Sequence, residues 1–173
     1  MNRNMNLYWV DRLPSGRVAI MPRPRGGDWL DDEIVAWKCE NVDVVVSLLM
    51  PDEVSDLELA NERELCCHNG IRFMSFPITD RSVPESREVF SEFIAVLADI
   101  CLVGQSLAVH CRQGIGRAAV VAICVLIRMG IEPNAAIELV SNARGVTVPE
   151  TLEQRRWVFD YAHSLPKPST TMG

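Results

Sequence analysis

A cysteine and an arginine bracket a short glycine-containing loop in the stretch SLAVHCRQGIGRA, residues 106–118. Gly114 and Gly116 allow the backbone to take conformations closed to other residues, so that its N–H groups can approach one anion closely. The guanidinium of Arg117 fits two oxygens of a phosphate group. The positive field of the loop favours the thiolate form of Cys111, and a thiolate beneath a phosphate is a nucleophile for phosphorus. The stretch therefore predicts a site where a cysteine attacks a phosphate ester.

Breaking a phosphate ester also requires a proton donor, because an unprotonated alkoxide or phenolate is a poor leaving group. Asp80 follows the apolar run at residues 71–76, and Cys111 follows another at residues 107–110. If both runs are parallel strands, their ends meet at one edge of a sheet, where α/β folds place their ligands. Asp80 is therefore the candidate general acid, and the alternative is that it only shapes a turn.

Strands and helices are predicted to alternate along the chain. The run from Ala118 to Met129 is apolar nearly all round, which predicts a buried helix directly after the loop 111–117, called the catalytic loop below. This alternation predicts an α/β fold with a largely parallel, twisted central sheet flanked by helices. Short apolar or β-branched runs predict strands at residues 7–10, 17–21, 42–49, 71–76 and 107–110.

Capping signals predict where the remaining helices begin and end. A Ser or Thr three residues before Glu is typical of a capping box, and a nearby proline suits the first turn of a helix. A glycine favours a helix end. These signals predict helices after Asp28, over residues 55–68 (opened by Ser55 and Glu58), after residues 82–85, over residues 133–144 (ended at Gly145) and after residues 147–150.

The motif His110-Cys111, five residues and Arg117 resembles the signature of the cysteine-dependent protein tyrosine phosphatases, especially the small dual-specificity branch. With the strand before it, the helix after it and the aspartate upstream, the resemblance covers roughly residues 17–162. It implies a protein tyrosine phosphatase-like fold and hydrolysis by two in-line displacements through a phosphocysteine, without a metal or cofactor. Asp80 would be the acid in the first displacement and the base in the second.

The resemblance also implies roles for residues around the nucleophile. His110 would orient the loop and support the thiolate, with a core histidine as the alternative. Gln154 is similar to the glutamine that positions water in some members, with exposed helical polarity as the alternative. Ala118 departs from the family pattern, which commonly has Ser or Thr there to steady the leaving thiolate, and this departure bears on the speed of turnover. The implied substrate-binding residues are Arg112, Gln113, Gly114, Ile115, Gly116 and Arg117.

These features predict a phosphatase for phosphoproteins that prefers phosphotyrosine, with phosphoserine and phosphothreonine as further substrates. One alternative is a phosphatase for a non-protein ester such as a phosphoinositide or nucleotide; the absence of lysine from the catalytic loop counts against an inositol lipid. The other is a catalytically weak, phosphate-binding pseudophosphatase, which Ala118 favours. Arg23 and Arg25 could attract an anionic substrate, or simply belong to a solvated loop.

Composition sets the remaining expectations. A length of 173 residues predicts one phosphatase domain, placed at residues 1–165, and the Pro-, Ser- and Thr-containing tail 166–173 is expected to be disordered. A net charge of −6 argues against a nucleic-acid partner, and no apolar run is long enough to insert into a membrane. Six cysteines without metal-site spacing predict reduced thiols in a cytoplasmic protein; Cys39, Cys101 and Cys124 are expected in the core. The oligomeric state is left open.

Overall fold

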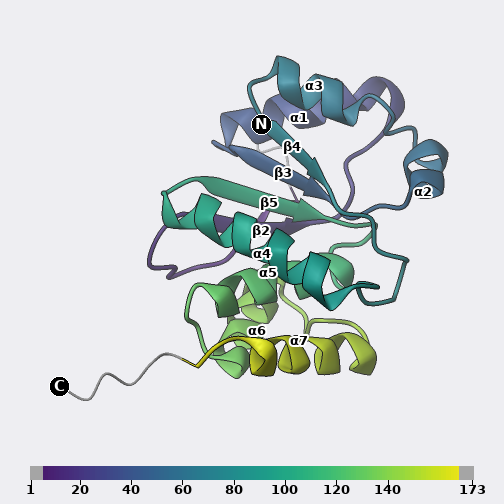
Figure 1. Cartoon of the computed structure of the whole chain (residues 1–173). Coiled ribbons are helices and arrows are strands. Elements are labelled where there is room, and N and C mark those ends of the chain that lie inside the picture. The colour runs from purple at the N-terminus through teal and green to yellow at the C-terminus, as the bar shows by residue number, and fades with distance from the viewer. Residues whose placement is uncertain (1–5, 168–173) are drawn as a thin grey trace.

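The computed structural model describes residues 6–167, which fold around a five-stranded sheet (Figure 1). The strand order is β1-β2-β5-β3-β4, and every neighbouring pair is parallel except β1 with β2. The predicted α/β fold with a largely parallel sheet is therefore confirmed. The strands are β1 Tyr8–Trp9, β2 Arg17–Met21, β3 Val44–Ser47, β4 Arg72–Ser75 and β5 Ser106–His110.

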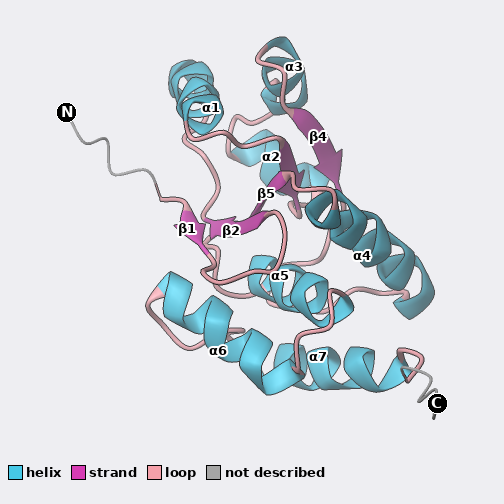
Figure 2. Ribbon diagram, turned by 90° about the vertical axis from the view of Figure 1, so that its left-hand side faces the viewer, coloured by secondary structure: helices cyan, strands magenta, loops and turns pink. Residues whose placement is uncertain are grey.

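Helices cover both faces of the sheet (Figures 1 and 2). Alternate residues of β2 show the division, because Val18 and Ile20 pack with α4 and α5, whereas Ala19 and Met21 pack with α1 and α3. α6 and α7 pack against α5 on the side away from the sheet. The helices are α1 Leu30–Cys39, α2 Pro51–Asp56, α3 Glu62–His68, α4 Arg87–Leu102, α5 Arg117–Arg128, α6 Pro133–Arg144 and α7 Leu152–Ser164.

α5 is the central helix that its apolar sequence predicts. It packs on the sheet beside α4 and is covered on its other side by α6 and α7, so all of its residues except Arg128 are buried. The next helix, α6, occupies the predicted range. Glu132 caps its start by accepting a hydrogen bond from the Ala135 amide, and Gly145 ends it with a φ of 80°.

The helix predicted over residues 55–68 is wrong, because the chain forms two short helices, α2 and α3, in this region. Glu58 lies between them with a φ of 56°, a left-handed conformation that interrupts a right-handed helix. The first helix begins at Pro51 rather than Ser55, and the Glu53 carboxylate accepts a hydrogen bond from the Met50 amide at its start.

Three other helix starts lie a few residues later than predicted. Asp28 belongs to a 3₁₀ turn, Gly27–Trp29, and α1 follows it. The caps of α4 and α7 are Ser86 and Thr151, whose hydroxyls accept hydrogen bonds from amides within the first turn, which is the contact that defines a cap. The placement of Cys39 in the core is also wrong, since this residue is exposed at the end of α1.

The carboxyl ends of four strands meet at one edge of the sheet. His110 at the end of β5 is in register with Met21 of β2 and with Ser47 of β3, and Ser47 is in register with Ser75 of β4. The segments that follow these strands therefore lie side by side at this edge, and they carry the residues of the candidate site. Of the tail predicted to be disordered, all but Pro166 and Lys167 lies outside the described residues.

Candidate active site

The catalytic loop connects the end of β5 to the start of α5. Cys111 is 3% exposed at the first position of the loop, and its Sγ accepts a hydrogen bond from the Gly114 amide at 3.3 Å. Gly114 has a φ of 74°, and a Cβ built on it would lie 2.6 Å from the backbone of Met21. Both observations require glycine at this position, so that an amide can point at the sulfur.

The side chain of Arg117 is buried and held in a fixed orientation. Its two terminal nitrogens donate to the two oxygens of Glu53 at 2.7 and 2.8 Å, and Nη1 also donates to the carbonyl of Ile78 at 2.8 Å. Burial by itself lowers the pKa of Arg117, but the hydrogen bond and the negative charge of Glu53 and the charges of Cys111 and Asp80 outweigh it and raise the pKa. Its Nε is buried and has no hydrogen-bond partner within residues 6–167, so it remains available to a ligand oxygen.

Glu53 was not predicted as a site residue, and its position explains how Arg117 is oriented. Burial raises the pKa of Glu53, but the hydrogen bonds from Arg117 and the Met50 amide and the positive charges of Arg117 and Arg112 together lower it. Glu53 is therefore ionised and forms a bidentate pair with Arg117. The sequence around Glu53 shows only an acidic residue in the first turn of a helix, and this does not indicate a contact with Arg117.

Asp80 lies on the loop after β4 and lines the same pocket as residues of the catalytic loop. Its Oδ1 accepts a hydrogen bond from Nη2 of Arg117 at 3.0 Å, and half of its side chain is exposed. Asp80, Cys111 and Arg117 line one pocket of about 50 Å³, together with Arg81, Arg112, Gln113, Ile115, Gly116 and Glu150. The three residues predicted to do the chemistry are thus brought together. Of the predicted binding residues, Gly114 is absent from this lining but donates to the sulfur.

His110 is completely buried beneath the catalytic loop. Its Nε2 lies 2.6 Å from Oε1 of Glu62, and its Nδ1 lies 3.4 Å from the carbonyl oxygen of Cys111. Both neighbouring atoms are hydrogen-bond acceptors, so a ring N–H can donate to either of them. These contacts link α3 to the catalytic loop. Glu62, 2% exposed, is the second acidic residue that the sequence did not identify.

Gln154 is buried in the first turn of α7 rather than exposed on it. Its Oε1 accepts a hydrogen bond from the Thr151 amide, and its Nε2 donates to the carbonyl of Ser82 at 3.1 Å. A Cβ on Gly116 would lie 3.0 Å from this Nε2, so the amide is adjacent to the catalytic loop. It does not line the pocket. Its position ties α7 and the Asp80 loop to the catalytic loop.

The other cysteines differ from Cys111 in their surroundings. Burial raises the pKa of Cys66 to about 12, with further contributions from the charge of Glu62 and from Cys67, and burial raises the pKa of Cys101 to about 11. The pKa of Cys124 is also raised well above the ordinary value by burial. These three thiols are therefore protonated near neutral pH, and none of them lines the pocket.

Comparison with known families agrees with this geometry. The family model described as "Polymorphic toxin system, DSP-PTPase phosphatase" matches residues 19–131, a span that contains the catalytic loop, Asp80 and Glu53. This chain belongs to that family. DSP-PTPases are the dual-specificity branch of the protein tyrosine phosphatases, so the resemblance found in the sequence is confirmed.

Individual relatives of this DSP-PTPase point to the same group. Cyclin-dependent kinase inhibitor 3 of Rattus norvegicus is 27% identical over 115 residues, which are 65% of this chain and 54% of the relative. The chain thus spans about half the length of this curated relative. Kinase associated phosphatase, in a form with its catalytic cysteine replaced by serine, has a TM-score of 0.82 at 18% identity, covering 94% of this chain and 97% of its own. Tk-PTP in its active form has a TM-score of 0.73 at 24% identity, covering 92% and 98%. These two likenesses confirm the fold.

Two further findings concern possible ligands and surroundings. Within residues 6–167, no cluster of three or more His, Cys, Asp or Glu side chains is arranged to bind a metal ion. No helix in the same range combines the length and the apolar character needed to cross a membrane.

Proposed function

We propose that this DSP-PTPase is a protein phosphatase that hydrolyses phosphotyrosine, with phosphoserine and phosphothreonine as further substrates. The observation that carries the proposal is the pocket of about 50 Å³ that Cys111, Arg117 and Asp80 line together. A nucleophile, a cation for the phosphoryl oxygens and a carboxyl group for the leaving oxygen are the three groups that the reaction requires.

The first displacement transfers the phosphoryl group to Cys111. The phosphate dianion binds to the amides of the catalytic loop and to Arg117. The Nε of Arg117 has no hydrogen-bond partner among the described residues, and Glu53 fixes the orientation of its guanidinium. The thiolate attacks phosphorus, a P–S bond forms, and the P–O bond to the substrate breaks. The leaving oxygen takes the proton of Asp80.

The second displacement releases phosphate. Asp80, now a carboxylate, takes a proton from a water molecule as that water attacks phosphorus, and the P–S bond breaks to regenerate the thiolate. His110, which Glu62 contacts, would orient the catalytic loop and support the thiolate, and Gln154 would help to place the water. Ala118 offers no hydroxyl to the departing sulfur, so we expect this step to be the slower one.

Phosphoproteins are the proposed substrates because of the family and the catalytic loop. The rat relative is named for a cyclin-dependent kinase and a structural neighbour is a kinase associated phosphatase, which favour protein substrates over small esters. The loop contains no lysine to pair with extra phosphate groups of an inositol lipid. We also propose that residues 1–165 act as one phosphatase domain and that the protein works in the cytoplasm, where a nucleophilic thiol stays reduced.

The test is a steady-state assay of wild type and Cys111→Ser with an aryl phosphate, phosphotyrosine and phosphoserine peptides, phosphoinositides and nucleotides. We expect turnover of the aryl phosphate and the phosphotyrosine peptides, and none with Cys111→Ser. If a phosphoinositide or a nucleotide had a higher kcat/KM than every phosphopeptide, the proposed substrate class would be wrong. Substrate binding without turnover by wild type would instead favour the pseudophosphatase.

A further inference from the structure

Arg144 is the last residue of α6, and its guanidinium contacts the catalytic loop from outside the pocket. Its Nη2 donates a hydrogen bond to the carbonyl of Gln113, and its Nε donates to the carbonyl of Gly114, both at 3.3 Å. Within residues 6–167, no carboxylate lies at ion-pair distance from this guanidinium. Its polar contacts are therefore directed at the loop, although the reaction scheme gives it no role.

The peptide unit between Gln113 and Gly114 joins Arg144 to the nucleophile. Its carbonyl accepts the hydrogen bond from Arg144, and its N–H donates to Sγ of Cys111 at 3.3 Å. This peptide is trans and planar, with its C=O and N–H pointing in opposite directions. A donor that holds the oxygen outside the pocket therefore also holds the N–H toward the sulfur. Because linked hydrogen bonds polarise one another, the positive charge at the oxygen strengthens the donation to a thiolate.

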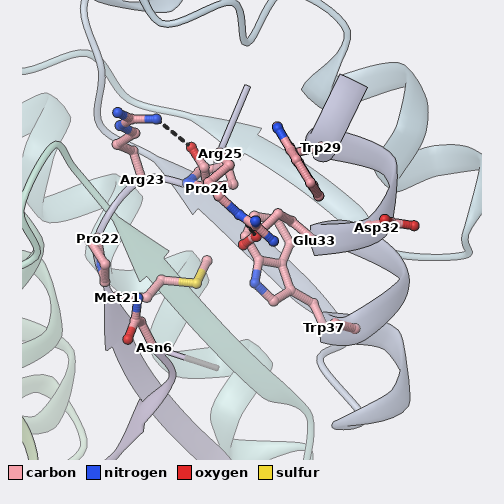
Figure 3. A pocket seen from close by; sticks show the side chains of 11 residues that line it. Asn6, Met21, Pro22, Arg23, Pro24, Arg25, Trp29, Asp32, Glu33 and Trp37 are labelled. Carbon is pink, nitrogen blue, oxygen red and sulfur yellow. Dashed lines mark hydrogen bonds and ion pairs between the residues drawn. The ribbon is translucent and has the colours of Figure 1, made fainter. Parts of the chain in front are cut away.

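The carbonyls at the start of the loop are held by other partners. The carbonyl of Arg112 accepts a hydrogen bond from the Arg23 amide at 3.1 Å, and Nδ1 of His110 lies 3.4 Å from the carbonyl oxygen of Cys111. Figure 3 shows that the Arg23 side chain turns to the neighbouring backbone carbonyl, so the segment after β2 holds the loop through its backbone. Arg144 instead uses its side chain, and it holds two consecutive carbonyls.

Tyr8 fixes the position of the Arg144 side chain. The guanidinium lies 4.1 Å from the centre of the Tyr8 ring, which is a cation–π contact. Tyr8 belongs to the two-residue strand β1, which contacts α6 (Figure 2). Its side chain packs on the face of the sheet that α5 covers, whereas the next residue, Trp9, packs on the other face. β1 thus places an aromatic ring against a side chain that is otherwise half-exposed at the end of a helix.

We infer that Arg144, held by Tyr8, is a positioning residue that keeps the peptide unit between Gln113 and Gly114 turned toward the Cys111 thiolate. The inference rests on the proposed function only in taking Cys111 as the nucleophile. Before the first displacement the N–H stabilises the thiolate that attacks phosphorus. In the second displacement the same N–H receives the sulfur again as the P–S bond breaks. Without Arg144 the peptide is free to turn, and a smaller fraction of the enzyme carries the thiolate.

The experiment measures how fast iodoacetamide alkylates Cys111 as a function of pH, with the labelled peptide quantified by mass spectrometry. The reagent is uncharged, so the rate reports the fraction of thiolate rather than attraction of the reagent to Arg144. In Arg144→Gln the profile should shift to higher pH by about 0.5–1 unit, the effect of losing roughly one hydrogen bond, and its alkaline plateau should not fall. The other charged or titratable side chains around Cys111 stay the same: Asp80, Arg81, His110, Arg112, Arg117 and Glu150.

Matched variants separate the contact from the charge. Arg156→Gln removes an equal charge from an exposed position of α7 and should leave the profile at its wild-type position. Arg144→Lys keeps the charge but presents one nitrogen to two carbonyls, so its profile should lie between those of wild type and Arg144→Gln. Tyr8→Leu releases the guanidinium and should cause a smaller shift in the same direction, whereas Tyr8→Phe keeps the aromatic ring and should cause none. The kcat/KM for an aryl phosphate should fall in the same order.

The outcomes also separate this inference from the proposed function. A folded Arg144→Gln with the wild-type profile would overturn the inference, as would an equal shift in Arg156→Gln. If Arg144→Gln does not fold, the Tyr8 variants decide, and identical profiles for Tyr8→Leu and Tyr8→Phe would overturn it. Alkylation requires no turnover, so a shifted profile in an enzyme that hydrolyses no phosphate ester would support the role of Arg144 and contradict the proposed function.

Discussion

Glu53 accepts two hydrogen bonds from Arg117, and replacing it shows how much the fold depends on holding this guanidinium. Arg117 is 1% exposed in the wild type, and Glu53→Ala removes the carboxylate that accepts two of its hydrogen bonds. Removing one member of a buried ion pair costs about 3–5 kcal/mol, because the other charge stays buried without compensation. We expect the free energy of unfolding to fall by an amount in this range. Arg117 keeps the Ile78 carbonyl and Asp80, which places the expected loss toward its lower end.

Glu53→Gln separates charge from shape. The amide retains one oxygen acceptor for Arg117 but loses the negative charge, and the loss of a hydrogen bond to a charged group costs about 1.5–3 kcal/mol. The control is Glu33→Ala, which breaks the more exposed pair with Arg25 and should cost only about 0–1 kcal/mol. Urea unfolding followed by tryptophan fluorescence measures all three variants at neutral pH. Equal stability of Glu53→Ala and Glu33→Ala would refute the reasoning.

The same pair predicts a dependence of stability on pH. The folded-state pKa of Glu53 lies below its ordinary value of 4.5, so the unfolded chain binds a proton more readily than the folded one. The contribution of Glu53 is therefore fully present above pH 4.5 and is lost as the pH falls through the lowered folded value. The difference in unfolding free energy between wild type and Glu53→Gln should shrink in acid. A difference that stays constant from neutral pH down to this range would contradict the assignment.

Three further predictions concern the catalytic steps and the loop. Asp80→Asn should lower kcat by roughly 10²–10⁴-fold for esters with poor leaving groups and much less for those with acidic phenols, and a uniform loss would mean that Asp80 only shapes its loop. Ala118→Ser should raise steady-state turnover by up to about ten- to a hundredfold and leave the pre-steady-state burst unchanged, because a hydrogen bond to the departing thiolate is worth about 1.5–3 kcal/mol. A wild type without a burst, together with a variant that is no faster, would refute this. Gly114→Ala should destabilise the loop and lower vanadate binding measured by calorimetry, because its Cβ would lie 2.6 Å from Met21, and unchanged binding would contradict the role of the φ of 74°.

The sequence predicted correctly those helices and strands whose ends are marked by residues next to them in the chain. α6 has a glutamate cap, a proline in its first turn and a glycine with positive φ after its last residue, so its range could be predicted from the sequence. β3 and β5 could also be predicted, because each is buried along its whole length and a buried parallel strand shows as a largely uninterrupted apolar run. The helix over residues 55–68 could not be predicted correctly, because the left-handed conformation of Glu58 depends on the packing of the neighbouring segments.

The residues of the candidate site also fall into those that the sequence could predict and those that it could not. The cysteine, the arginine and the glycines of the catalytic loop are close together in the sequence and could be recognised as a motif. Glu53 and Glu62 contact Arg117 and His110 across 64 and 48 positions of the chain, so no local pattern reports them. Their importance follows from burial, because a buried charge needs a partner and the strand order decides which partner it has. The roles assigned to Asp80, His110 and Gln154 in the reaction stay predictions.

The central claim is that phosphate is transferred to Cys111 before it is released. The most direct measurement mixes the enzyme rapidly with a phosphotyrosine peptide that carries radiolabelled phosphate, quenches the reaction in acid during the first turnover and maps the labelled peptide of the enzyme. We predict label on the peptide that contains Cys111, in an amount that grows with the burst of tyrosine product, and none in Cys111→Ser. Full turnover without label on the enzyme, or label on any other residue, would contradict the phosphocysteine mechanism.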